Sequence, residues 1–240
     1  MLTSSKLGAD SWFQQVREIC IRYQLPHPIS LLQHPPTTSS YKRLVRSRII
    51  DHWEVKLRSD ALRLSSTPYF KPNFMSLMKP HPMWSACGSN PFQCHKAVIA
   101  ARMLSGRYLT DQLQRHWTSN KEGYCLLPSC TPSQSIGSLE HLLLYCTSLH
   151  DTRVKLVDLC NRLSEEDETL ANIIQTTITD TNLSNFTQIL LDCTSVPSVI
   201  LATQIQGNTY IRDRLLFLGR TWCHSIHRER MKQLGLLKFR

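Results

Sequence analysis

Four residues between positions 125 and 146 have the types and spacing of metal ligands. Four residues separate Cys125 from Cys130, ten more follow, and four again separate His141 from Cys146. Structural Zn²⁺ is held tetrahedrally by four nitrogen or sulfur donors, which usually come as two pairs from short turns or helix starts. The pattern therefore predicts a zinc site formed by Cys125, Cys130, His141 and Cys146.

The chain around these four residues suits that role. Pro128 and Ser129 favour a bend in the backbone between Cys125 and Cys130. A polar loop then connects this pair to His141 and Cys146 at a low cost in conformational entropy. The stretch SLEHLLLYC predicts a short helix capped by Ser138, with a loosened last turn that swings Cys146 inward. Because a Gly/Ser/Thr/Pro loop buries little apolar surface, a metal is favoured over three buried thiols and a surface histidine.

The chemistry expected of this site is structural. Four protein ligands close the coordination sphere and leave no position for water, so the ion would stabilise the fold and would not catalyse. Two other groups combine Cys and His at poorer spacing: His81, Cys87, Cys94 and His95, and also Cys223, His224 and His227.

Cysteine usage and hydropathy indicate the compartment. The nine cysteines are odd in number and unevenly spaced, and the first residues do not resemble a secretory signal. Such cysteines are typical of a reducing compartment, where they are buried thiols or metal ligands. No apolar run approaches the roughly 18–20 residues that cross a bilayer. We expect a soluble intracellular protein, cytoplasmic or nuclear, without a membrane partner.

Charge is distributed in blocks along the chain. The total is +10, with +10 in residues 1–124, −6 in residues 125–205 and +6 in residues 206–240. Two basic blocks favour a polyanionic partner such as RNA or DNA, although the same cations could simply solvate helix faces. The candidate phosphate contacts are Arg43, Arg46, Arg102, Arg107 and Arg115.

Apolar periodicity is helical through most of the sequence. Spacings of three and four predict helices over 11–25, 41–64, 94–104, 150–163, 164–178, 184–193 and 208–235, with a short one ending near 117. Ser11 is a candidate N-cap, and Ser164 with Asp167 has the form of a capping box. Residues 26–40 and 65–92 are expected to be irregular connectors.

The expected fold class is mainly α, a helical bundle-like body with a small zinc-stapled loop–helix module. The predicted organisation is a basic helical region (1–124), the zinc module (125–150) and a C-terminal helical region ending in a basic helix (151–240). Aromatic residues Tyr69, Phe70, Phe74 and Trp84 lie among lysines. They could stack on unpaired bases, but we favour their packing a Pro-rich loop onto the body.

Two motifs resemble a known family. LSGRY (104–108) and EHLLLYC (140–146), followed by Thr-Arg at 152–153, resemble the region downstream of the polymerase in non-LTR retrotransposon reverse transcriptases. The resemblance spans about residues 10–160. It implies a Cys-Cys-His-Cys zinc element on the four ligands named above, followed by Arg153, and a part in binding template RNA or target DNA.

The departures from that family bear on activity. The chain has no Asp-Asp pair, and hence no Tyr/Phe-x-Asp-Asp polymerase motif, while Glu54-Val-Lys56 is only half of a nuclease motif on a predicted helix. No nucleophile, base or open metal position forms a catalytic set, so we expect neither enzymatic activity nor a small-molecule substrate. We expect a zinc- and nucleic-acid-binding module; the alternative is a structural or protein-interaction domain, such as an inactive polyprotein fragment.

Overall fold

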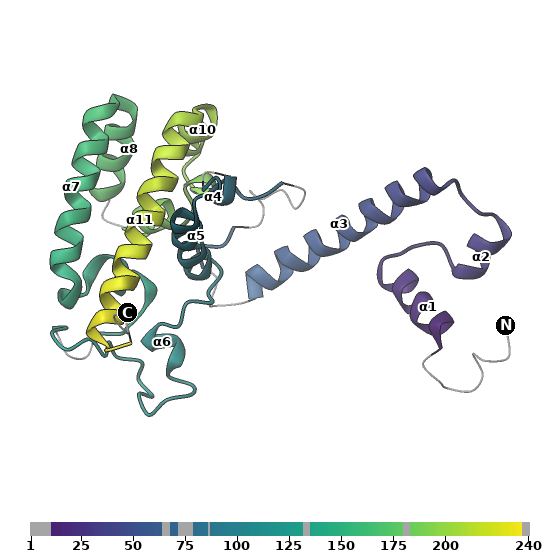
Figure 1. The fold of residues 1–240 in the computed structure, drawn as a ribbon, viewed down its shortest axis with the longest axis horizontal. Helices are drawn as coiled ribbons and strands as arrows, with labels where there is room; N and C mark the ends of the chain where they lie inside the picture. The colour runs from purple at the N-terminus through teal and green to yellow at the C-terminus, as the bar shows by residue number, and fades with distance from the viewer. Residues whose placement is uncertain are drawn as a thin grey trace. The chain divides into compact units, whose positions relative to one another are not determined.

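The computed structural model describes residues 11–63, 68–71, 79–85, 87–131, 135–179 and 183–236. Within these ranges the chain is mainly α-helical, which confirms the predicted fold class, and Tyr124 and Ile136 form an isolated antiparallel bridge. The chain divides into two compact units, residues 1–63 and 64–240 (Figure 1). This division falls inside the predicted segment 1–124.

The first unit contains three helices: α1 (Trp12–Arg22), α2 (Pro28–Gln33) and α3 (Thr38–Arg63). Ser11 caps α1 as predicted, its side chain accepting a hydrogen bond from the Gln14 amide at 3.3 Å. The expectation of an irregular connector over 26–40 is wrong, because α2 forms there. Pro28 suits the first helical position, where its missing N–H is not needed, and the His27 side chain accepts from the Ile29 amide.

Helix α3 leaves its apolar residues largely uncovered. The sequence predicted an apolar stripe along it, yet none of its described side chains is buried, and Trp53 is 46% exposed. Ion pairs one turn apart, Lys56 with Asp60 at 3.1 Å and Arg58 with Glu54, line its surface.

The second unit holds the remaining helices. They are α4 (Pro82–Ser85), α5 (Pro91–Leu104), α6 (Asp111–Gln114), the π-helix η3 (His141–Tyr145), the 3₁₀ helix η4 (Thr147–Leu149), α7 (His150–Glu166), α8 (Glu168–Thr179), α9 (Ser184–Asp192), the 3₁₀ helix η5 (Cys193–Ser195), α10 (Val199–Gly207) and α11 (Thr209–Gln233). Helix α11 packs against α5, α7 and α9 and is the centre of this unit (Figure 1).

The apolar face of α11 explains its central place. Leu215, Leu218, Trp222 and Ile226, which recur every three or four residues, are buried, whereas Tyr210 is 45% exposed. Tyr210 instead donates a hydrogen bond to Glu166 at the end of α7. The buried apolar face of α11 therefore runs from Ile211 to Ile226, and Tyr210 lies outside it.

Helix boundaries follow local capping chemistry. The predicted break after α5 is confirmed, with Gly106 at a φ of +66°. The predicted helix start at Ser164 is wrong, because α7 continues to Glu166 and the Ser164 hydroxyl donates to the Cys160 carbonyl at 2.9 Å. Asp167 takes the capping position, its carboxylate accepting from the Leu170 amide at 3.0 Å.

Helix α10 was not predicted, because Pro197 ends the preceding helical pattern and the following stretch lacks a clear apolar period. Among the described residues no single helix is long and apolar enough to cross a membrane; the pair Ser184–Ser195 and Val199–Gly207 meets those limits only together, with a bend of 47° between its parts. The α9 residues from Phe186 to Asp192 are buried in the core of the second unit.

Candidate metal centre

The structure brings the four predicted ligands together. Their donor atoms, the thiol sulfurs of Cys125, Cys130 and Cys146 and a ring nitrogen of His141, all lie within 4.8 Å of one another. All four residues are buried. Residues 21 positions apart in sequence thus meet in one small volume, as a shared ion would require.

The spacing of the donors suits a tetrahedral zinc ion. With Zn–S bonds of about 2.3 Å and Zn–N bonds of about 2.0–2.1 Å, tetrahedral angles place two sulfurs about 3.8 Å apart, and a sulfur and a nitrogen about 3.6 Å apart. The Cys125 and Cys146 sulfurs are 3.8 Å apart, and the Cys130 sulfur lies 3.3 Å from His141 Nε2. Three thiols and an imidazole also match the ligand types that zinc prefers in structural sites.

A short paired segment positions the first two ligands. The Cys125 amide donates to the Ser135 carbonyl and the Gly137 amide to the Gly123 carbonyl, each at 2.8 Å, which closes the loop between them. A tight turn then brings the Cys130 amide to the Leu127 carbonyl at 3.1 Å. The turn predicted from Pro128 and Ser129 is therefore present, and it directs both sulfurs to the same side.

The second pair depends on a wide helical turn. Ser138 caps it as expected, its hydroxyl accepting from the His141 amide at 3.1 Å. The following turn is a π-helix, in which the Cys146 amide donates to the His141 carbonyl five residues back at 2.7 Å. An α-helix would place residues five apart on different sides, so the π-turn is what brings Cys146 beside His141.

The electrostatics of the cluster favour a thiolate at Cys146. The hydrogen bond from Cys125 lowers the pKa of the Cys146 thiol to about 4, with His141 acting in the same direction and burial opposing. The same hydrogen bond, together with burial, raises the pKa of Cys125. One ligand is thus prepared as a thiolate, the form that binds zinc.

A half-buried arginine lies beside the thiols. Arg153 Nη1 is buried without a hydrogen-bond partner among the described residues. Burial lowers the pKa of Arg153, and the charges of Cys146 and Cys130 oppose that effect. Three thiolates around a divalent ion carry a net negative charge, which this guanidinium would offset, so the orphaned donor group fits a metal-loaded site.

Side chains from α11 fix the metal loop to the body of the unit. Trp222 Nε1 donates to the Leu143 carbonyl at 3.1 Å. Arg230 forms a buried ion pair with Asp111 at 3.0 Å, and the other oxygen of Asp111 accepts from the Leu126 amide at 3.4 Å. The sequence did not identify the pair of Asp111 and Arg230, because 118 intervening residues hide it from any local pattern.

The other Cys/His groups do not assemble into metal sites among the described residues, where the cluster at 125–146 is the one group that qualifies. His81 instead contacts Asp192 at 3.2 Å, and the Cys87 sulfur accepts from Arg220 at 3.2 Å. Burial, with nearby positive groups, lowers the pKa of His224 to about 4. Glu54, from the nuclease half-motif, pairs with Arg58 on α3.

The five candidate phosphate contacts are exposed: Arg43, Arg46, Arg102, Arg107 and Arg115. The first two lie on α3 in the first unit, and the other three lie at or after the end of α5 in the second. Within the described part of the chain none of them forms an ion pair, so each is available to an anion.

The aromatic residues of the Pro-rich stretch were expected either to pack the loop onto the body or to stack on unpaired bases. Tyr69 is buried and Phe70 packs against the core, as expected of residues that pin a loop, whereas Trp84 is 42% exposed. Phe74 lies outside the described residues.

Comparison with known proteins adds no identity to these observations. No family model, curated protein or solved structure matches this chain. The resemblance to a retrotransposon tail rests on the sequence motifs alone, and the metal cluster rests on its own geometry.

Proposed function

We propose that this protein is a non-catalytic nucleic-acid-binding module whose loop–helix element at 125–146 is held by a structural zinc ion. The observation that carries the proposal is the convergence of Cys125, Cys130, His141 and Cys146 to within 4.8 Å. The motifs that resemble the tail of a non-LTR retrotransposon reverse transcriptase support the same role.

Two features favour zinc: the types of the four ligands, and the free-energy cost of gathering them in a buried site that holds no ion. Three buried thiols and one imidazole place their donor atoms within 4.8 Å of one another, an arrangement that core packing alone does not require. Closed four-ligand sites contribute directly to folding, because the unfolded chain has no preformed site. The ion would therefore stabilise the second unit.

Metal analysis of the natively purified protein tests the zinc site. We expect one zinc per chain, a large fall in thermal stability in strong chelator, and loss of the metal in Cys146→Ser. Cys160→Ala is the matched control, because Cys160 is also buried but lies outside the cluster. A wild-type protein that holds no zinc and melts identically with and without chelator would contradict the site.

Nucleic-acid binding is favoured by the exposed cations. Arg102, Arg107 and Arg115 are exposed at and after the end of α5, shortly before the metal loop in sequence. None of them forms an ion pair within the described residues. Contacts between arginine and phosphate release counterions, so their strength falls steeply with salt. Such contacts position the chain on a strand without reading its sequence.

Fluorescence anisotropy with single-stranded RNA and DNA over a salt series tests this binding. We expect Arg102→Gln with Arg107→Gln to weaken binding and to flatten the salt dependence. Lys155→Gln with Arg162→Gln is the control, since it removes the same charge from exposed positions in the acidic middle of the chain. Equal losses in both double variants, or no binding by the wild type, would count against the proposal.

A protein-interaction role is the second candidate, and one observation favours it. The first unit leaves several large apolar side chains uncovered, including Trp12 at 74% and Leu62 at 91% exposure. Salt-insensitive capture of a protein partner, without retention on heparin, would support this alternative over the first.

A further inference from the structure

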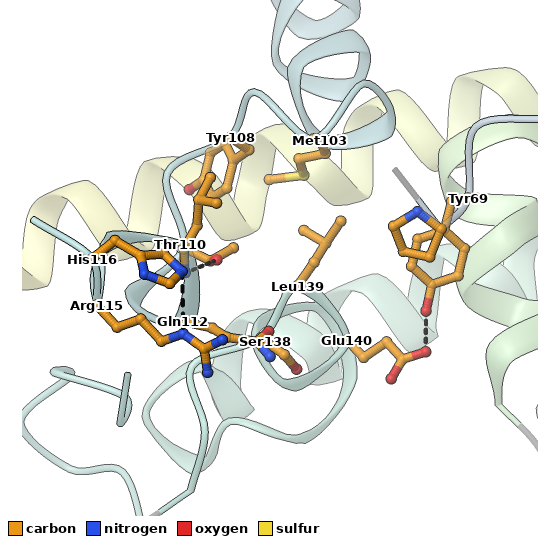
Figure 2. A pocket seen from close by; sticks show the side chains of 13 residues that line it. Tyr69, Met103, Tyr108, Thr110, Gln112, Arg115, His116, Ser138, Leu139 and Glu140 are labelled. Atoms are coloured by element: carbon orange, nitrogen blue, oxygen red, sulfur yellow. Dashed lines mark hydrogen bonds between the residues drawn. The ribbon is translucent and has the colours of Figure 1, made fainter. Parts of the chain in front are cut away.

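A pocket opens directly beside the metal loop. It has a volume of about 520 Å³ and lies between the loop that follows α5 and the residues that lead into the π-helix (Figure 2). This volume is in the range of small-ligand sites, about 300–1,000 Å³. Glu140 on its wall directly precedes the metal ligand His141, so a loaded metal centre would hold one side of the pocket in place.

The pocket has an apolar patch in its middle, polar side chains from Thr110, Gln112 and Ser138, and charged groups at its ends. Met103, Tyr108 and Leu139 line its middle, where a planar ring could lie against them. Arg115 and His116 stand at one end, and Tyr69 and Glu140 at the other (Figure 2). These groups suit a flat ligand that has hydrogen-bond acceptors along one edge and donors along another.

The carboxylate end is held in a fixed orientation. The Tyr69 hydroxyl donates to Glu140 Oε1, a contact between residues 71 positions apart in sequence. Burial, reinforced by this hydrogen bond, raises the pKa of Tyr69, so the phenol remains a donor at all physiological pH values. Tyr69 is the one described donor to Glu140, so Oε2 and the second lone pair of Oε1 can accept from a ligand.

The opposite end presents donors. Arg115 Nε lies 3.5 Å from His116 Nε2, and both side chains are largely exposed to solvent at the mouth of the pocket. A guanidinium offers several N–H donors in one plane, which suits two adjacent acceptors on a ring edge.

We propose that this pocket binds an unpaired guanine base of a single-stranded nucleic acid, an inference that rests on the proposed nucleic-acid-binding function and adds a base preference to it. Guanine carries two parallel donors on its Watson–Crick edge, N1–H and the N2 amine, which match the two oxygens of Glu140. Its O6 and N7 are adjacent acceptors, which match Arg115. The ring would lie against Met103 and Leu139.

The other bases do not fit this arrangement. Adenine and cytosine each place a ring-nitrogen acceptor beside their amine, so a carboxylate meets one donor and one repelling lone pair. Uracil has a single N–H between two carbonyls, which repel a carboxylate on both sides. Unpaired bases, whose Watson–Crick edges are free, are the usual targets of base-specific recognition in RNA.

Binding of five-nucleotide RNAs tests the proposal. We expect the full-length, zinc-loaded wild type to bind UUGUU about tenfold more tightly than UUAUU, UUCUU or UUUUU, since one good bidentate contact discriminates by about that factor. Glu140→Gln should abolish the preference while keeping the salt-dependent binding. Glu122→Gln is the matched control, because it removes the same charge from an exposed residue that does not line the pocket. Zinc content is measured in each variant to exclude damage to the metal site.

Calorimetric titration with guanosine and adenosine monophosphates separates the pocket from the backbone contacts. Preferential binding of the guanine nucleotide, lost in Glu140→Gln, would support the pocket even if long strands bound poorly. Equal binding of all four pentamers with steep salt dependence would overturn the guanine site and leave the proposed function intact. Absence of binding by pentamers and nucleotides alike would overturn both.

Discussion

At the scale of single residues, buried polar groups are paired across long stretches of sequence. Asp192 is fully buried and binds His81 at 3.2 Å through one oxygen and the Ser195 hydroxyl at 2.5 Å through the other. Gln188 donates to the Ser195 hydroxyl at 3.0 Å and to the Tyr69 carbonyl at 3.1 Å. This network ties the segments around 69 and 81 to the end of α9.

Replacement of the buried carboxylate should destabilise the fold. We expect Asp192→Asn to lower the free energy of unfolding by about 3 kcal/mol at pH 7, because the new amide nitrogen cannot accept one of the buried hydrogen bonds that the two carboxylate oxygens make with His81 and Ser195. Urea unfolding measures this loss, and Asp158→Asn, an exposed residue of α7, is the control. An effect of Asp192→Asn no larger than that of the control would contradict the importance of the pair.

The same variant carries a pH signature. Burial opposes ionisation of Asp192, but its hydrogen bond and attraction to His81 prevail and lower its pKa below the ordinary value of 3.8. A depressed carboxylate pKa stabilises the fold above 3.8 and loses that contribution as pH falls towards the folded-state pKa. The difference between wild type and Asp192→Asn should therefore shrink below pH 3.8, whereas acid loss of metal affects both proteins alike.

At the scale of elements, one close helix crossing organises the second unit. A Cβ placed on Gly219 of α11 would lie 2.1 Å from the Leu190 carbonyl oxygen of α9. Only a glycine allows two backbones to approach so closely. The buried faces of α9 and α11 meet at this point, with Phe186 and Trp222 rings edge to face and 5.4 Å apart.

Filling that contact should disrupt the crossing. We expect Gly219→Ala to lower the free energy of unfolding by about 3 kcal/mol, since backbone cannot yield as a flexible side chain can. Gly207→Ala at the end of α10, where an added Cβ meets nothing within 4 Å, should be neutral or slightly stabilising. Thermal melts of the two variants check the contrast, and similar melting temperatures would contradict the close approach.

At the scale of the whole molecule, folding changes which basic residues can meet a partner. Residues 206–240 carry a net charge of +6 in sequence, but Arg220 and Arg230 are buried. Arg220 donates to the Met83 carbonyl at 3.1 Å, and Arg230 pairs with Asp111. The C-terminal basic helix is therefore partly a core element, and the exposed cations before residue 124 become the stronger candidates for phosphate contact.

The first unit should contribute to that contact through α3. We expect Arg43→Gln with Arg46→Gln to reduce the slope of log affinity against log salt by about 1.4 on single strands, the value for two lost phosphate contacts. Lys56→Gln with Arg58→Gln on the same helix should change it less, because carboxylates already pair those cations. Identical slopes for the two double variants, measured by anisotropy, would contradict a specific role for the start of α3.

The sequence by itself determined the helical class, several helix ends and the identity of the four clustered residues. Those features depend on neighbours within a few turns: Ser11 and Ser138 cap their own helices, and each ligand pair is separated by four residues. Local rules failed at Ser164, because Asp167, three residues later, is also a good capping residue and its carboxylate is the one that accepts from a free helix amide.

Only the tertiary structure decided the pairing of Asp111 with Arg230, the burial of Arg220, the close crossing at Gly219 and the pocket between Tyr69 and Arg115. Each brings together segments that are far apart in the chain, so no periodicity or spacing reports it. The physical reason is that helix propensity, capping and turn formation act between near neighbours, whereas close packing and the pairing of buried charges depend on which faces meet once the helices have assembled.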